Sequence, residues 1–258
     1  MRPVPERLLA DRRGVLRFAV AGACLAAAGS LTRPTWAAET AAHFAVMRSG
    51  DRIGEGRVVY QREGDALRVR VAMEAKVKFG FVTLFRYRHE SEELWRDGRL
   101  AALDGRTDDD GKEYHMTARP SANGLAVEGT KGSFTAPADV LPLSYWHPDT
   151  VNQSLLLDAS KGRLIAVDFV AGARETIDTD RRDVLARRYD TAGDLKFSLW
   201  YDTLGAWVRT RIKKKGSDID LVLDEAPIFA AGMLAPAVTQ DWATLGAATS
   251  LASYPSAY

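Results

Sequence analysis

Apolar residues recur at every second position over long stretches of this chain, and this alternation constrains its fold more than any other feature. The clearest stretch, residues 67–79, reads LRVRVAMEAKVKF, with charged residues at most of the intervening positions. Successive side chains of a β-strand point to opposite faces, so the pattern predicts a strand with one buried and one solvent-exposed face. Thirteen residues at about 3.3 Å each give a strand of roughly 40 Å, a length typical of large antiparallel sheets and barrels.

The same alternation returns in residues 195–202 and 218–223. Pairs that favour tight hairpin turns separate the alternating stretches, among them Asp97-Gly98, Asp110-Gly111 and Asn123-Gly124. The alternation of helices and strands that a parallel α/β sheet needs is absent. The sequence therefore predicts an all-β, mainly antiparallel fold: a strongly curved sheet or an incomplete β-barrel, with a long irregular connection around residues 134–160.

The first 37 residues predict an export signal rather than part of the fold. Arg12-Arg13 begin a twin-arginine pattern, and the apolar stretch 18–31 that follows is too short to span a bilayer comfortably. Small residues before Ala37 favour cleavage after that position; lipoprotein processing at Cys24 is the alternative. We therefore expect a periplasmic or secreted protein exported by the twin-arginine route.

Composition is informative once residues 1–37 are set aside, since they hold six arginines and two acidic residues. Of 35 basic and 34 acidic residues, 29 and 32 remain, so the net charge changes from +1 to about −3. Such a surface argues against nucleic-acid binding, which needs a clustered basic face. No remaining stretch predicts an integral membrane span. The only cysteine lies in the signal, so neither a disulfide nor a thiolate metal site is expected.

The remaining chain divides into a β domain, residues 38–225, and a C-terminal segment, residues 226–258. The second part has one charged residue, Asp241, among ten alanines and three prolines. We expect this low-charge segment to be a tail or a strap packed over the sheet, because its apolar residues would otherwise form an exposed patch.

A search for catalytic motifs finds none, and no cofactor or metal is predicted. The glycines of residues 50–56 precede a strand rather than the helix that a phosphate-binding loop requires. The acidic turn at 108–110 offers carboxylates for calcium, but it lacks the roughly six to eight oxygen ligands at fixed offsets that calcium needs, and a tight acidic hairpin explains it better. A hydrolase using His89, Glu93 and His147 is the enzymatic alternative, although no nucleophile motif accompanies these residues.

Aromatic residues suggest a binding site more than an active site. Tyr145, Trp146 and His147 follow one another in the irregular connection, and Trp200 lies on a late strand. Trp and Tyr combine a large apolar face with a polar tip, which suits the mouth of a binding site, although core packing is the simpler alternative. With His89, these four are the candidate ligand-binding residues. Because Trp200 and Tyr201 are consecutive on a strand, they must face opposite sides of the sheet.

Four blocks in order along the chain carry a resemblance to a known family: YRHESEELWRDGRL, TDDDGKEY, LPLSYWH and LWYDTLGAWVRT. Together with DRIGEGRVVY, they make residues 43–224 similar to an exported bacterial family of unknown function. The resemblance implies a β-rich exported protein, distantly similar to the half-barrels of periplasmic lipoprotein carriers. It implies no activity and carries no catalytic residue.

These observations support three hypotheses. The first is non-enzymatic binding of an apolar or amphipathic, lipid-like ligand by the curved sheet. The second is an envelope-associated scaffold that binds an unidentified protein partner through a sheet edge or the C-terminal segment. The third is the hydrolase described above.

Overall fold

The computed structural model describes residues 39–227 except 180, 194 and 215. The expected signal peptide, residues 1–37, lies outside the described residues, as does the expected C-terminal segment 226–258 apart from its first two residues. In the described part, no helix has the length and apolar character needed to cross a membrane.

The described chain is almost entirely β-structure, which confirms the all-β prediction. Its strands are β1 (Glu39–Arg48), β2 (Asp51–Glu63), β3 (Ala66–Phe79), β4 (Val82–Arg96), β5 (Arg99–Asp109), β6 (Lys112–Ser121), β7 (Gly124–Gly129), β8 (Gly132–Ala136), β9 (Leu141–Pro142), β10 (Leu155–Asp158), β11 (Arg163–Thr179), β12 (Arg182–Gly193), β13 (Phe197–Asp202), β14 (Trp207–Lys214) and β15 (Ser217–Glu225). The one helical element in the described residues is a short 3-10 turn, η1 (Pro148–Asn152).

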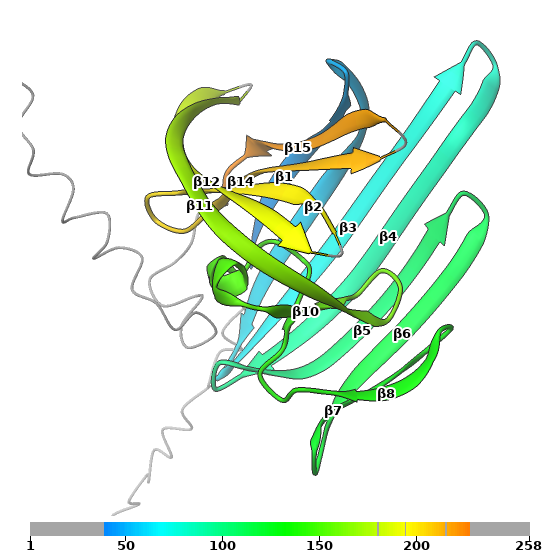
Figure 1. Ribbon diagram of the computed structural model, residues 1–258, viewed down its shortest axis with the longest axis vertical. Helices are drawn as coiled ribbons and strands as arrows, with labels where there is room; N and C mark the ends of the chain where they lie inside the picture. Colours follow the sequence, from blue (N-terminus) through cyan, green and yellow to red (C-terminus); the bar gives the residue numbers. More distant parts are fainter. Residues whose placement is uncertain (1–38, 180, 194, 215, 228–258) are drawn as a thin grey trace, which may run out of the picture. The chain divides into compact units, whose positions relative to one another are not determined.

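One sheet contains all fifteen strands, and its first and last strands meet in the middle. The order is β8-β7-β6-β5-β4-β3-β2-β1-β15-β14-β13-β12-β11-β10-β9. Every pair is antiparallel except β9 with β10. Because the order ends at β8 on one side and β9 on the other, the sheet is not closed into a barrel. This confirms the incomplete-barrel prediction (Figure 1).

The alternation predicted for β3 is present in the structure. Leu67 and Val69 are fully buried, whereas Arg70 and Glu74 on the same strand are exposed. The predicted turns also form: Asp97 and Gly98 have φ of 49° and 72°. Positive φ at both central positions is the geometry of the type I′ turns that join twisted antiparallel strands. Local sequence thus sets which face of β3 is buried and where the chain turns from β4 into β5.

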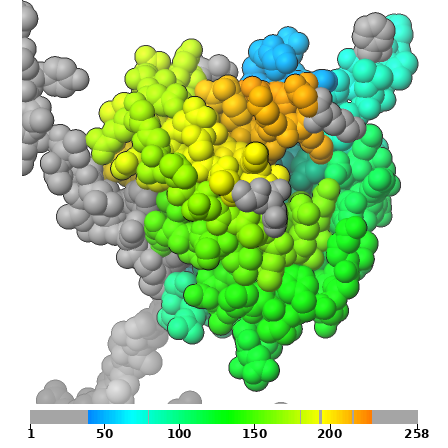
Figure 2. Space-filling model, viewed as in Figure 1, coloured from blue at the N-terminus to red at the C-terminus, as the bar shows by residue number. Residues whose placement is uncertain are grey.

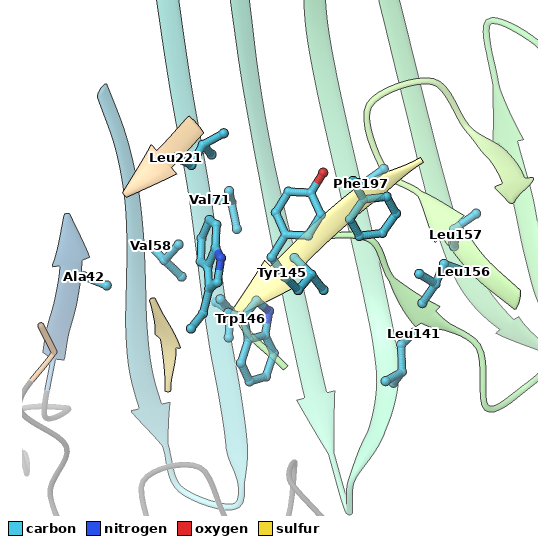
Figure 3. Packing of buried hydrophobic residues seen from close by; sticks show 14 of the residues in the cluster. Ala42, Val58, Val71, Leu141, Tyr145, Trp146, Leu156, Leu157, Phe197 and Leu221 are labelled. Carbon is cyan, nitrogen blue, oxygen red and sulfur yellow. The ribbon is translucent and has the colours of Figure 1, made fainter. Parts of the chain in front are cut away.

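The hydrophobic core lies between the two halves of the sheet, β1–β8 and β9–β15. An irregular strap, residues 137–154, connects them and places its own aromatic residues in this core. Figure 3 shows Tyr145 beside Phe197 of β13, and Trp146 among the other core residues. The Tyr201 hydroxyl of β13 donates hydrogen bonds to the carbonyl oxygens of Tyr145, at 2.6 Å, and His147, at 3.3 Å. The strap is therefore the irregular connection expected around residues 134–160, and hydrogen bonds from β13 in the core hold it in place.

Candidate functional site

A cavity of about 560 Å³ opens between the two halves of the sheet. Figure 2 shows the surface hollowed between the orange strands β14–β15 and the cyan to green strands beside them. Most of its lining is apolar: Val46, Ile53, Val71, Met73, Ala75, Val77, Leu84, Phe85, Leu143, Leu195, Ile212, Ile219 and Leu221. The volume lies within the range of small-molecule binding sites, and predominantly apolar walls are typical of them.

The apolar lining contributed by the two halves of the sheet is continuous because of one strand pairing. β1 pairs with β15, so that Arg48 lies opposite Ile219 and Val46 opposite Leu221. This pairing continues the inner face of β1–β4 directly into that of β14–β15. Side chains far apart in the sequence therefore line one space.

Polar groups gather where the cavity meets the strap and the β10–β11 turn. Asp158 accepts hydrogen bonds from Ser160 Oγ at 2.5 Å and from Arg163 Nε at 3.1 Å. Tyr87 also hydrogen-bonds Ser160, and burial raises the pKa of its hydroxyl. These groups already have protein partners, so they tolerate an apolar ligand beside them.

His89, one of the predicted binding residues, lines the cavity from β4. Its Nδ1 lies 2.9 Å from Thr107 Oγ1 on β5, and its side chain is almost wholly buried. Burial lowers the pKa of His89 to about 4, because the charged imidazolium would lose its hydration. His89 is consequently neutral at physiological pH and offers a polar but uncharged surface.

Glu93 is a fully buried acid that follows His89 along the same face of β4. Its Oε2 accepts hydrogen bonds from the indole N–H groups of Trp95, at 2.8 Å, and Trp146, at 2.9 Å. Burial raises the pKa of Glu93, with Ser144 and the two indoles opposing that effect. Because Trp146 belongs to the strap, Glu93 joins the strap to β4.

Trp146 and His147 lie in the packed core and are not among the residues that line the cavity. The Trp146 ring packs edge-on against Tyr60 and Trp95, with centroids 5.7 and 5.5 Å apart. His147 Nδ1 accepts a hydrogen bond from the Asp149 N–H at 3.2 Å and so caps η1. Both residues position the strap. Tyr145, in contrast, adopts a positive φ of 66° and lines the cavity.

Trp200 lies on the opposite face of β13 from Tyr201, as the alternation predicts. Its ring lies between its two cross-strand neighbours, with the guanidinium carbon of Arg188 at 5.3 Å and that of Arg209 at 5.2 Å from the ring centroid. Trp200 is fully buried and belongs to the hydrophobic core, and these cation–π contacts stabilise its ring where it meets the two arginines. The structure therefore separates Trp200 from the cavity and brings only Tyr145 and His89 of the five predicted residues to it.

The rim of the cavity carries an excess of positive charge. Asp109 is bound by Lys161 and Lys214, each at 3.2 Å. Burial acts to raise the Asp109 pKa, but these two lysines outweigh it and lower the pKa. The other lining carboxylates, Glu74 and Asp158, pair with arginines at 3.4 and 3.1 Å.

Two cations of the lining are held by no tight ion pair in the described part of the chain. Arg48 Nη2 donates to the neutral Ser217 Oγ at 3.1 Å, and the Lys213 side chain is 80% exposed, 3.8 Å from Asp218. An anionic group at the rim would therefore meet cations whose charge is only weakly balanced.

The acidic turn at 108–110 uses its carboxylates within the protein. Asp108 Oδ1 accepts from the Gly111 N–H at 2.7 Å and Asp108 Oδ2 from Arg86 at 2.5 Å, while Asp109 holds the two lysines. Across residues 39–227, outside the three gaps, no cluster of three or more metal-binding side chains occurs.

The residues considered for hydrolysis have separate roles. Glu93 binds two indoles, His89 binds Thr107, and His147 caps η1. None of the hydrogen bonds that these side chains make within the described residues joins any two of the three.

Several cavity residues escaped the sequence analysis, notably Arg48, Tyr87 and Ile212. The alternation showed that Ile219 and Leu221 share a buried face, but not which strand that face meets. Tyr87 could have been found, because it shares the inner face of β4 with His89.

Fold and cavity together define the class: an antiparallel β-barrel-like protein with an open sheet and a largely apolar cavity between its halves. The chain belongs to the family described as "Domain of unknown function (DUF6134)", whose model matches residues 44–224. This confirms the resemblance to an uncharacterised β-rich family.

A solved structure shares the fold. It is the β-barrel-like protein of domain of unknown function DUF1849 from Brucella abortus, with a TM-score of 0.53 and 13% identity, covering 74% of this chain and 98% of that one. Among curated proteins, none matches the chain.

Proposed function

We propose that this protein is exported and that its cavity binds an amphiphile with one acyl chain and an anionic head group. The observation that carries the proposal is the apolar lining shared by both halves of the sheet: Val71, Ala75 and Val77 on β3, and Ile212, Ile219 and Leu221 on β14 and β15. An acyl chain against this lining gains about 0.8 kcal/mol for each methylene removed from water.

The charges at the rim give the ligand an orientation. Arg48 and Lys213 lie at the open side, where an anionic head would reach them while remaining in contact with water. The inner polar residues, including neutral His89, are already hydrogen-bonded. The acyl chain therefore extends inward and the head stays at the rim.

A larger hollow, of about 710 Å³, lies along β4, β5 and β6, but it supports a ligand site less well. Its lining is mostly polar and charged, including Arg88, Asp104, Arg106 and Glu113. It lacks the extended apolar lining that would give an amphiphile its binding energy.

Export is proposed from the sequence of residues 1–37, with its paired arginines and short apolar stretch. A binding protein for amphiphiles suits the space between membranes, where such molecules are insoluble and need a carrier or a receptor.

The test compares two substitutions on one strand. Ala75 is buried and lines the cavity, whereas Ala72, three residues earlier on β3, is exposed on the outer face. Ala75→Trp should fill the cavity and reduce binding of a fluorescent fatty acid at least about tenfold, because the methylenes would lose their apolar contacts. Ala72→Trp should bind like the wild type. Lipid mass spectrometry of the protein purified from cells should show an acyl compound in the wild type and the Ala72→Trp variant alone.

The head-group assignment has its own comparison. Arg48→Gln should weaken binding of a fatty acid more than binding of the fatty alcohol of equal chain length, because only the acid carries the charge. Wild-type protein that never contains an acyl compound and does not bind the fluorescent fatty acid would contradict the proposal. Equal binding by folded Ala75→Trp, checked by its thermal melting, would place any ligand elsewhere.

A further inference from the structure

The turn between β3 and β4 exposes a cluster of large apolar side chains. Phe81 is fully exposed at 108%, and Val82 and Leu84 are 61% and 59% exposed. In Figure 1 this turn projects beyond the neighbouring β5–β6 hairpin. We call Gly80–Phe85 the β3–β4 tip. Soluble domains seldom keep such residues together in water unless the patch binds something.

Basic residues flank the β3–β4 tip, and acidic ones are missing from the same stretch. Residues 75–89 read AKVKFGFVTLFRYRH, with four basic residues and no Asp or Glu. Lys76 and Lys78 are exposed on β3, and Lys76 lies directly opposite Arg86 of β4. Arg86 is itself bound by Asp108 of β5, whereas Lys76 and Lys78 form no ion pair with the described residues.

We propose that the β3–β4 tip inserts into the surface of an anionic lipid bilayer. Phe81 lies in the turn itself, and Val82 and Leu84 follow it at the start of β4, so the three exposed side chains gather at the end of the hairpin. A partner protein would cover one face, whereas the acyl region of a bilayer can surround all three residues. Lys76 and Lys78 lie a few residue pairs behind the end of the hairpin, at the level where lipid phosphates would be. Positive charge near an anionic surface adds to the binding from apolar burial.

The tip adjoins the cavity. Val77, Leu84 and Phe85 belong both to the hairpin end and to the cavity lining. A bilayer bound at the tip would therefore lie beside the mouth through which an amphiphile enters or leaves. The inference goes beyond ligand binding and stands whether or not the cavity holds an acyl chain.

Vesicle flotation of the protein purified from cells tests this proposal. Vesicles of phosphatidylcholine with about one quarter phosphatidylglycerol should carry the wild-type protein upward, and Phe81→Asp should reduce the partition coefficient at least about tenfold. Leu204→Asp is the matched control, because Leu204 is 66% exposed in the turn between β13 and β14. The control should bind like the wild type.

The charges are tested in the same assay. Lys76→Glu with Lys78→Glu should weaken binding to anionic vesicles and leave weak binding to pure phosphatidylcholine unchanged, and added salt should have the same effect as the substitution. Arg96→Glu with Arg99→Glu, at the opposite end of β4, should change little. Thermal melting of each variant confirms folding, which exposed substitutions should preserve.

The other outcomes are also decisive. Wild-type protein that does not float with anionic vesicles, or a Phe81→Asp variant that floats as well as the wild type, would overturn the inference. So would equal loss in the Leu204→Asp control. Crosslinking of the tip to a protein in cells, without vesicle binding, would assign the surface to a protein partner instead. Fatty-acid binding by Phe81→Asp should remain unchanged, so that failure here is distinct from failure of the cavity proposal.

Discussion

Single residues show how the protein keeps ionisable groups in its interior. Glu93 and His89 lie on the same face of β4, and burial favours the uncharged form of both. It raises the pKa of the acid and lowers that of the imidazole, because each charged form would lose hydration that neighbouring groups replace only in part. The two residues therefore give opposite dependences of stability on pH.

Glu93→Gln should increase stability relative to the wild type as pH rises from about 5 to about 8. The folded-state pKa of Glu93 lies above its unfolded value, so its contribution is complete below pH 4.5 and is lost as pH rises through the folded-state pKa. Glutamine stays neutral, and its carbonyl oxygen can accept from both indoles. Urea unfolding at the two pH values measures the difference.

Glu93→Ala should destabilise the protein, since it leaves two buried indole N–H groups without an acceptor. Its free energy of unfolding should be lower than that of the wild type by about 3 kcal/mol or more at both pH values. Glu113→Gln, at an exposed position on β6, controls for loss of a surface charge. If the Glu93→Gln variant kept the pH profile of the wild type, Glu93 would not be the group responsible.

For His89, acid should have the destabilising effect. Its folded-state pKa of about 4 lies below the ordinary histidine value of 6.5, so its contribution is complete above pH 6.5 and is lost as pH falls toward 4. Each unit by which the pKa is lowered corresponds to about 1.4 kcal/mol, so the free energy of unfolding falls by roughly 3 kcal/mol at most. His89→Gln should lack this part of the acid dependence, measured by denaturant unfolding at neutral pH and at about pH 4.5. His115→Gln, at an exposed histidine, should retain it.

The long strands and the strap are stabilised in different ways. β3 and β4 are defined by their own alternation and end at turns whose sequences favour positive φ. The strap has no such periodicity, and tertiary contacts hold it: Trp146 to Glu93 and the Tyr201 hydroxyl to two strap carbonyls. Its order therefore depends on residues of other elements.

Tyr201→Phe tests that dependence by removing one oxygen and keeping the ring. We expect a loss of about 1–2 kcal/mol, because the Tyr145 and His147 carbonyls lose a buried donor. Hydrogen–deuterium exchange should accelerate in residues 143–153 more than in β3 or β4. Tyr189→Phe, a half-buried neighbour on β12, provides the control. Uniformly faster exchange in every strand would mean that the hydroxyl supports the whole fold rather than the strap.

For the molecule as a whole, the open sheet provides a cavity between halves that are joined by β1 and β15. Whether the protein is exported, as residues 1–37 predict, is a separate question. Fractionation of cells with a tagged chain can answer it without reference to the cavity.

The double substitution Arg12→Lys and Arg13→Lys should abolish export, because recognition by the twin-arginine route depends on the two guanidinium groups. Cell fractionation should then find the uncleaved chain in the cytoplasm, while the wild type appears outside it and shortened by about 37 residues. Arg2→Lys with Arg7→Lys keeps the same charge and should be exported normally. Export of the first double variant at the wild-type level would exclude this route.

Local sequence is sufficient to specify which face of each long strand is buried, where hairpins turn, and that Trp200 and Tyr201 diverge. These properties follow from the two-residue period of a strand and from local backbone preferences. The folded chain adds that β1 pairs with β15, that Ile219 and Leu221 adjoin the wall containing Val71, and that Trp146 packs on Glu93. Periodicity fixes a side chain relative to its own strand, whereas its neighbours depend on pairing between segments distant in the chain, and no local preference encodes that choice.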